Sequence, residues 1–158
     1  MISLKEFQSV VKFAPLVSID LCLVYKEKIL LGMRKNEPLK GVWFTPGGRI
    51  LKNEPWRDCL RRVAKTELGY HFNDPGAFSL MGVWDHFYSN SAYDSDSSTH
   101  YVNLPHYLIL KEKPSFRSDS QHQELKWFDL SHVVNGTFFH EHMQTYANWL
   151  IQKGLDND

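Results

Sequence analysis

The 158-residue sequence has little cysteine, no net charge and no long apolar run. Cys22 and Cys59 both lie in apolar segments, which indicates small buried residues rather than a disulfide or metal site and favours a reducing cytoplasm. Eighteen basic residues balance eighteen acidic ones, which argues against a nucleic-acid or membrane-surface protein held by bulk charge. No run approaches the ~20 apolar residues of a membrane span, and residues 1–20 lack a signal-peptide core.

The remaining composition is that of a globular protein, with 42% hydrophobic and 23% charged residues. The length predicts one domain over residues 1–158. Ser3 and Glu6 form a capping-box pair before a short amphipathic helix that Pro15 ends. Apolar patterning predicts strands at 16–25, 29–33, 42–44 and 125–128, β-rich segments at 78–88 and 101–110, and a final helix at 141–151. This order predicts an α/β fold, a mixed sheet with helices on both faces.

The stretch from Gly48 to Gly69 reads GRILKNEPWRDCLRRVAKTELG and predicts a turn followed by a helix. The adjacent glycines indicate the turn, Asn53 or Glu54 can cap the helix, and Gly69 suits its end. Trp56, Cys59, Leu60, Val63, Ala64 and Leu68 recur at helical spacing and make one apolar stripe.

Glu67 is predicted to project from the middle of this stripe, where an isolated carboxylate is costly unless a cation meets it. A buried ion pair and a metal ligand explain it equally well from the helix alone. The preceding glycine turn favours the metal, because its carbonyl oxygens can face the same cation.

Other side chains that could carry chemistry are spread along the chain. Asp20 lies in the apolar run LVSIDLCLV and should meet a cation or hydroxyls, unless it faces water from an edge strand. Arg34 and Arg49 suit bidentate contact with phosphate, although either alone is more often a solvated surface residue.

Two aromatic segments, 84–88 and 99–101, flank a polar insert and are expected to pair as neighbouring strands. His86, Tyr88 and Tyr101 could stack on a base or bond to sugar hydroxyls, and a cross-strand aromatic cluster is the simpler interpretation of each. The polar loop at 120–124 holds Gln121 and His122, and a loop histidine is a candidate base near neutral pH.

Gly48, Glu54, Arg62, Ala64, Glu67 and Gly69 fall on the spacing of a known signature, and on them the sequence resembles the Nudix hydrolases. Val63 and Thr66 stand where that family usually has glutamate. The resemblance implies a Nudix-type α/β/α sandwich. The segments LVSIDL, GMRKN, GVWFTPGGR, MGVWDHFY, THYV and the Gln-His pair are similar to one branch, the GDP-mannose mannosyl hydrolases, which also lacks the full acidic set.

By that similarity, one Mg²⁺ or Mn²⁺ per subunit is held by the carbonyl of Gly47, the carboxylate of Glu67 and the side-chain oxygen of Gln121. Arg34 and Arg49 neutralise a diphosphate, Asp20 and His86 contact the substrate or hold neighbouring groups, and Tyr101 assists the departing phosphate. His122 is the general base. The resemblance also suggests a homodimer.

The implied reaction is hydrolysis of a GDP-hexose at the sugar C1–O bond with inversion, giving GDP and free sugar. GDP-mannose is the first choice of substrate and GDP-glucose the second. Two alternatives stay open: a nucleoside diphosphate sugar pyrophosphatase that attacks phosphorus, and a nucleotide-sugar-binding module without turnover.

Overall fold

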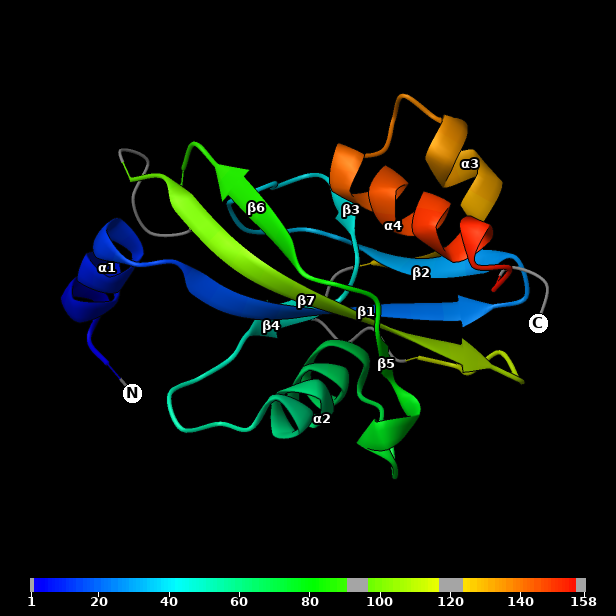
Figure 1. The fold of residues 1–158 in the computed structure, drawn as a ribbon, viewed down its shortest axis with the longest axis horizontal. Coiled ribbons are helices and arrows are strands. Elements are labelled where there is room, and N and C mark those ends of the chain that lie inside the picture. Colours follow the sequence, from blue (N-terminus) through cyan, green and yellow to red (C-terminus); the bar gives the residue numbers. More distant parts are fainter. Residues whose placement is uncertain (1, 91–96, 117–123, 156–158) are drawn as a thin grey trace.

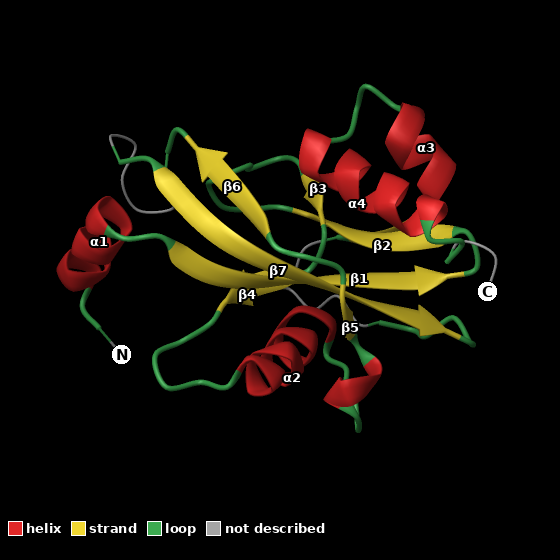
Figure 2. Ribbon diagram, in the orientation of Figure 1, coloured by secondary structure: helices red, strands yellow, loops and turns green. Residues whose placement is uncertain are grey.

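The fold is built on a mixed β-sheet that is covered by helices on both faces, as Figures 1 and 2 show. It is described here from a computed structural model over residues 2–90, 97–116 and 124–155. Two long strands, β1 (Leu16–Tyr25) and β7 (Thr99–Leu110), run parallel through its centre, with Leu16 opposite Tyr101 and Tyr25 opposite Leu110. The predicted α/β sandwich with a mixed sheet is confirmed.

The remaining strands add to these two. On one side, β2 (Lys28–Met33) pairs antiparallel with the end of β1, and β4 (Gly47–Arg49) pairs antiparallel with its first half. Strands β3 (Trp43–Phe44) and β8 (Leu125–Asp129) flank β2, while β5 (Ser79–Leu80) and β6 (Trp84–Tyr88) flank β7. The helices are α1 (Leu4–Phe13), α2 (Trp56–Leu68), α3 (Leu130–Asn135) and α4 (Glu141–Gln152), with a short 3₁₀ turn at Pro75–Ala77.

Alternation along β1 divides the core into two layers. Ile19, Leu21 and Leu23 pack with the buried face of α2, whereas Cys22 and Val24 pack with α3 and α4. A side-chain period of two puts successive residues on opposite faces, and because both faces of β1 are covered, the strand reads as a continuous apolar run. Both cysteines are free and buried, as predicted.

Helix α1 stands at the end of the sheet where β1 and β7 begin (Figure 1). Its capping box is present: the Ser3 hydroxyl accepts from the Glu6 N–H, and the Glu6 carboxylate accepts from the Ser3 N–H. Val11 is its buried residue, while Phe13 is 79% exposed. Among the described residues, none of the helices combines the length and apolarity needed to cross a membrane.

The predicted glycine turn is wrong, because Gly47–Arg49 forms strand β4. Glycine is needed there for space rather than for unusual backbone angles: a Cβ on Gly47 would lie 2.3 Å from Asp20 Oδ1 and 2.7 Å from the Ile19 carbonyl oxygen. The close approach of β4 to β1 therefore depends on the missing side chain.

The prediction for α2 needs two corrections. The helix begins at Trp56 after Pro55 without a side-chain cap, so neither Asn53 nor Glu54 caps it. Trp56 is also 36% exposed and stacks on the His106 ring instead of joining the apolar stripe, whose other predicted members are buried. Gly69 ends the helix in the left-handed conformation, as expected.

Candidate active site

A pocket of about 270 Å³ opens beside β4, between β1, β6, β7 and helix α2. Eight of the residues singled out from the sequence line it together: Asp20, Arg34, Gly47, Arg49, Glu67, His86, Tyr88 and Tyr101. The two others, Gln121 and His122, lie outside the described residues. Segments from most of the chain length thus meet in one cavity that carries cationic, carboxylate and aromatic groups.

Asp20 forms the buried base of this pocket and is 6% exposed, so the edge-strand interpretation is wrong. It lies on the α4 side of β1, where the Tyr146 hydroxyl donates to Oδ2 at 2.7 Å and Asn103 Nδ2 donates to the same oxygen at 2.6 Å. Asn103 Nδ2 and the Tyr146 hydroxyl also contact each other. The Ser18 hydroxyl orients Asn103 by donating to Oδ1 at 3.1 Å. One carboxylate oxygen is therefore fixed by a buried polar network.

The ionisation of Asp20 reflects this burial. Loss of hydration raises its pKa from 3.8 to about 6, and the hydrogen bonds from Tyr146 and Asn103, together with the charge of Arg34, limit the rise. Burial also raises the pKa of Tyr146, with a further contribution from the Asp20 charge, so Tyr146 stays a neutral donor. Asp20 consequently changes charge closer to neutral pH than an exposed aspartate does.

His86 lines the pocket beside this network, with Nδ1 3.3 Å from Asn103 Nδ2. Its ring stacks on that of His142 at a centroid distance of 3.6 Å and an interplanar angle of 6°. Burial, followed by the nearby His142 and His140, lowers the pKa of His86 to about 3. His86 is therefore neutral near pH 7 and suits contact with a ligand better than proton abstraction.

The expected pairing of the two aromatic segments is present in strands β6 and β7. His86 and Tyr101 are register partners on β6 and β7, and Tyr88 lies 6.4 Å from Tyr101 between ring centroids. These side chains face the pocket. Phe87 and His100, which are also register partners, have tilted rings with centroids 4.5 Å apart, and Phe87 is 69% exposed. The cross-strand cluster thus has one side that faces the pocket and one outer side.

The two pocket arginines are held in different ways. Arg34 donates from Nε to the Pro38 carbonyl at 2.8 Å, which leaves its terminal nitrogens for other partners. The Arg49 guanidinium lies over the ring of Phe7, 4.5 Å from its centroid. Their common position in the pocket makes them the candidates for binding an anionic ligand.

Glu67 lines the pocket from helix α2 and is half-buried. Val63 is 2% exposed and packs against Gly48. A Cβ added to Gly48 would lie 3.1 Å from Val63 Cγ2. Thr66 is exposed and does not line the pocket. Within the described chain, Glu67 is the one carboxylate that α2 supplies to this cavity.

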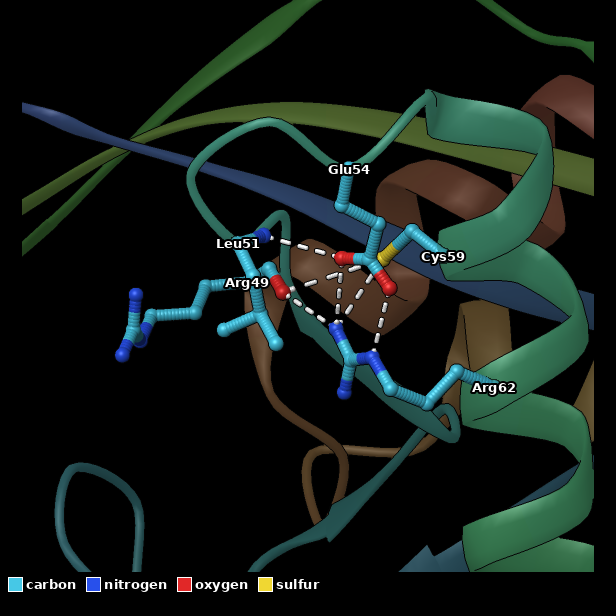
Figure 3. Close-up of polar contacts among 5 residues, drawn as sticks. All are labelled: Arg49, Leu51, Glu54, Cys59 and Arg62. Carbon is cyan, nitrogen blue, oxygen red and sulfur yellow. Dashed lines mark hydrogen bonds and ion pairs between the residues drawn. The ribbon is translucent and has the colours of Figure 1, made fainter. Parts of the chain in front are cut away.

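Figure 3 shows the ion pair that fixes the connection between β4 and α2. Arg62 donates to Glu54 at 2.7 and 3.0 Å and to the Arg49 carbonyl at 2.8 Å. Glu54 also accepts from the Leu51 N–H at 2.9 Å. Arg62 thus ties the loop and the backbone of Arg49 to the helix, on the side away from the Arg49 side chain.

Three residues of the site were not predicted from the sequence: Asn103, which lines the pocket, and Tyr146 and His142, which contact the lining residues Asp20 and His86. Tyr146 lies on the buried face of α4 together with Met143, Ala147 and Leu150. A phenol on such a face needs a partner for its hydroxyl. That requirement was the available signal, and Asp20 is the partner.

Comparison with known proteins identifies the family. A sequence model described as "NUDIX domain" matches residues 15–150. The chain belongs to the Nudix family. This Nudix protein is 40% identical over 124 residues to the low-salt glycan biosynthesis protein Agl8 of Haloferax volcanii. The aligned region covers 78% of this chain and 77% of Agl8. It is 29% identical over 136 residues to an ADP-ribose pyrophosphatase of Methanocaldococcus jannaschii, covering 85% and 75%.

Solved structures agree on the fold. The crystal structure of a MutT NUDIX hydrolase from Burkholderia pseudomallei superposes with a TM-score of 0.69, covering 86% of this chain and 98% of that one. Sequence identity in this comparison is 23%, so the likeness extends to the Nudix architecture alone.

Replacement of Asp20 by asparagine should change how stability depends on pH. Folding raises the pKa of Asp20 from 3.8 to about 6. The protonated carboxyl therefore stabilises the folded state fully below pH 3.8, and this stabilisation is lost as the pH rises through about 6. The free energy of unfolding of the wild type, relative to Asp20→Asn, should fall by about 2 kcal/mol between pH 4 and pH 7. Urea titrations in EDTA measure it.

His86 affects the pH dependence of stability in the opposite direction, because its low pKa destabilises the folded state in acid. This effect is present in both the wild type and Asp20→Asn, so it cancels in the difference between their unfolding free energies. Asp129→Asn, on an exposed residue paired with Lys28, is the matched control and should shift the curve far less. If the difference in unfolding free energy between wild type and Asp20→Asn does not change with pH, the raised pKa of Asp20 is contradicted.

Replacement of Glu54 by glutamine should destabilise the loop between β4 and α2. It weakens a charge-assisted pair whose acidic side chain is 13% exposed, and we expect a loss of about 1–2 kcal/mol of unfolding free energy in thermal or urea melts. Asp58→Asn breaks the Asp58–Arg61 ion pair on helix α2, in which both side chains are 54% exposed. This change should lower the unfolding free energy by under about 0.5 kcal/mol. Equal losses in the two variants would show that Glu54 has no special role.

Proposed function

We propose that this Nudix hydrolase cleaves a GDP-hexose at the sugar C1–O bond with inversion, releasing GDP and free sugar. The supporting observation is the pocket itself: two arginines and one helix carboxylate share it with Asp20, His86, Tyr88 and Tyr101. A single helix carboxylate suits one cation that supports a departing diphosphate, whereas an attack on phosphorus generally relies on a larger acidic set.

Nudix hydrolases use divalent cations, and the donors in this pocket fit Mg²⁺ or Mn²⁺. The Gly47 carbonyl and the Glu67 carboxylate are hard oxygen ligands of the type these ions prefer. The space beside Gly47 admits no Cβ, so β4 can bring its backbone close to the site. We expect Gln121 to complete the protein ligands, one ion per subunit. When bound, the ion neutralises charge on the diphosphate.

The roles of the other residues follow from their chemistry. Arg34 and Arg49 bind the diphosphate and stabilise the charge that develops on the departing GDP. Asp20, His86 and Tyr88 contact the substrate, and Tyr101 donates to the leaving phosphate. Water oxygen bonds to C1, the C1–O bond breaks with its electron pair going to GDP, and the water proton passes to His122. With a pKa of about 3, His86 is too weak a base for that last step.

Two relatives bear on the substrate. The 40% identity to a protein named for glycan biosynthesis supports a nucleotide sugar, with GDP-mannose first and GDP-glucose second. The 29% identity to an ADP-ribose pyrophosphatase supports the alternative, cleavage at phosphorus of a nucleoside diphosphate sugar. A cytoplasmic homodimer completes the proposal.

Hydrolysis in ¹⁸O-labelled water separates the two reactions. With GDP-mannose and Mg²⁺, we expect the label in the sugar, unlabelled GDP by phosphorus NMR, and an inverted C1 configuration in the first sugar formed. The same assay over GDP-glucose, ADP-ribose and UDP-glucose ranks the substrates. Label in phosphate, with GMP and sugar 1-phosphate as products, would overturn the proposal in favour of the pyrophosphatase.

Replacement of Glu67 or His122 tests catalysis against mere binding. His122→Ala should lower kcat by about 10²–10⁴-fold, the range for loss of a general base, with a small change in KM. Glu67→Gln should lower activity and raise the Mg²⁺ concentration needed for half-maximal rate. His71→Ala, on an exposed loop residue outside the pocket, is the control. A wild-type protein that binds GDP-sugars without turnover would identify a binding module instead.

A further inference from the structure

The side chain of Arg49 is supported by helix α1. Its guanidinium carbon lies 4.5 Å from the centroid of the Phe7 ring, so the cation rests on the aromatic face. Phe7 is half-buried in the middle of α1, whose start is fixed by the capping box of Ser3 and Glu6. The residue that faces the pocket from β4 is thus held by a separate element of the chain.

This mode of support leaves the binding capacity of Arg49 intact. A cation–π contact is an electrostatic attraction to the ring and occupies no oxygen or nitrogen acceptor, so the guanidinium can still donate hydrogen bonds to a phosphate. In the described part of the chain, no carboxylate lies within ion-pair distance of Arg49. The Phe7 ring can therefore restrict the rotamers of a long, flexible side chain without competing with a phosphate for the same donors.

The backbone of Arg49 is fixed independently. Arg62 holds its carbonyl at 2.8 Å, and the strand pairs with Ser18 on β1. With the backbone fixed from α2 and the guanidinium from α1, the direction of the side chain into the pocket is set at both ends. Preorganisation of this type lowers the entropy lost when a ligand binds.

We propose that Phe7 is a positioning residue for Arg49, and that α1 is thereby part of the diphosphate-binding site. This inference rests on the proposed function, in which Arg49 contacts the diphosphate. Helix α1 precedes the residues 15–150 that match the family, so the support comes from outside the matched segment.

The test is a calorimetric titration of GDP in Mg²⁺, repeated with inorganic pyrophosphate. Phe7→Leu keeps an apolar side chain and removes the aromatic face, and should weaken GDP binding about three- to tenfold. Phe7→Tyr keeps the face and should stay within about twofold of wild type. Phe13→Leu is the matched control, because Phe13 lies on the same helix, carries Lys12 over its ring and does not line the pocket.

A double-mutant cycle with Arg49→Gln distinguishes positioning from general structure. If Phe7 acts through Arg49, Phe7→Leu should cause no further loss once Arg49 is glutamine. Thermal melts accompany each titration, and Phe7→Met replaces Phe7→Leu if the latter lowers the melting temperature.

Each remaining outcome has a separate meaning. Additive losses, or failure of Phe7→Tyr to retain binding, overturn the positioning role. A strong effect of Arg49→Gln with no effect of Phe7→Leu overturns this inference and leaves the proposed function standing. A wild-type protein that binds neither GDP nor pyrophosphate overturns both.

Discussion

The site depends on one buried carboxylate. Asp20 lies on a central strand whose two faces are covered, and removing it from water is costly unless its oxygens are hydrogen-bonded. The fold meets that requirement with Tyr146 from α4 and Asn103 from β7. The same two residues lie beside His86, so the arrangement that satisfies Asp20 also fixes the imidazole that lines the pocket. Core packing and site geometry are parts of one network.

The absence of a side chain at Gly47 is a second constraint, and it is linked to the first. Asp20 and Gly47 are register partners on β1 and β4, and Asp20 Oδ1 occupies the space where a Cβ would be. One oxygen of Asp20 is thus directed to the Tyr146 hydroxyl and the Asn103 amide, while the other lies against β4, the strand that carries the candidate metal-binding carbonyl. The spacing between these two candidate site residues is set by backbone pairing, which is less variable than side-chain packing.

Much of this protein could be predicted from sequence, and the failures have physical reasons. Period-two and helical patterns located β1, β2, α2 and α4, and a resemblance in spacing brought together eight residues that the structure places in one pocket. Strand β4 was misread because glycine pairs permit turns and also permit close strand contact, and sequence alone does not separate the two. Tyr146 and Asn103 were missed because their partner, Asp20, is 126 and 83 residues away. The assignments of Gln121 and His122 stay predictions.

The imidazole of His86, which lines the pocket, and those of His142 and His140 next to it bear on how the proposed anionic substrate would reach the pocket. Burial lowers the pKa values of His86, His140 and His142, so these three rings are uncharged near neutral pH. Neutral rings add no long-range attraction for the proposed diphosphate, and among the described residues that line the pocket the positive charges are those of Arg34 and Arg49. A modest change of pH near neutrality therefore leaves the charge of these three rings, and their effect on the electrostatic potential of the pocket, unchanged.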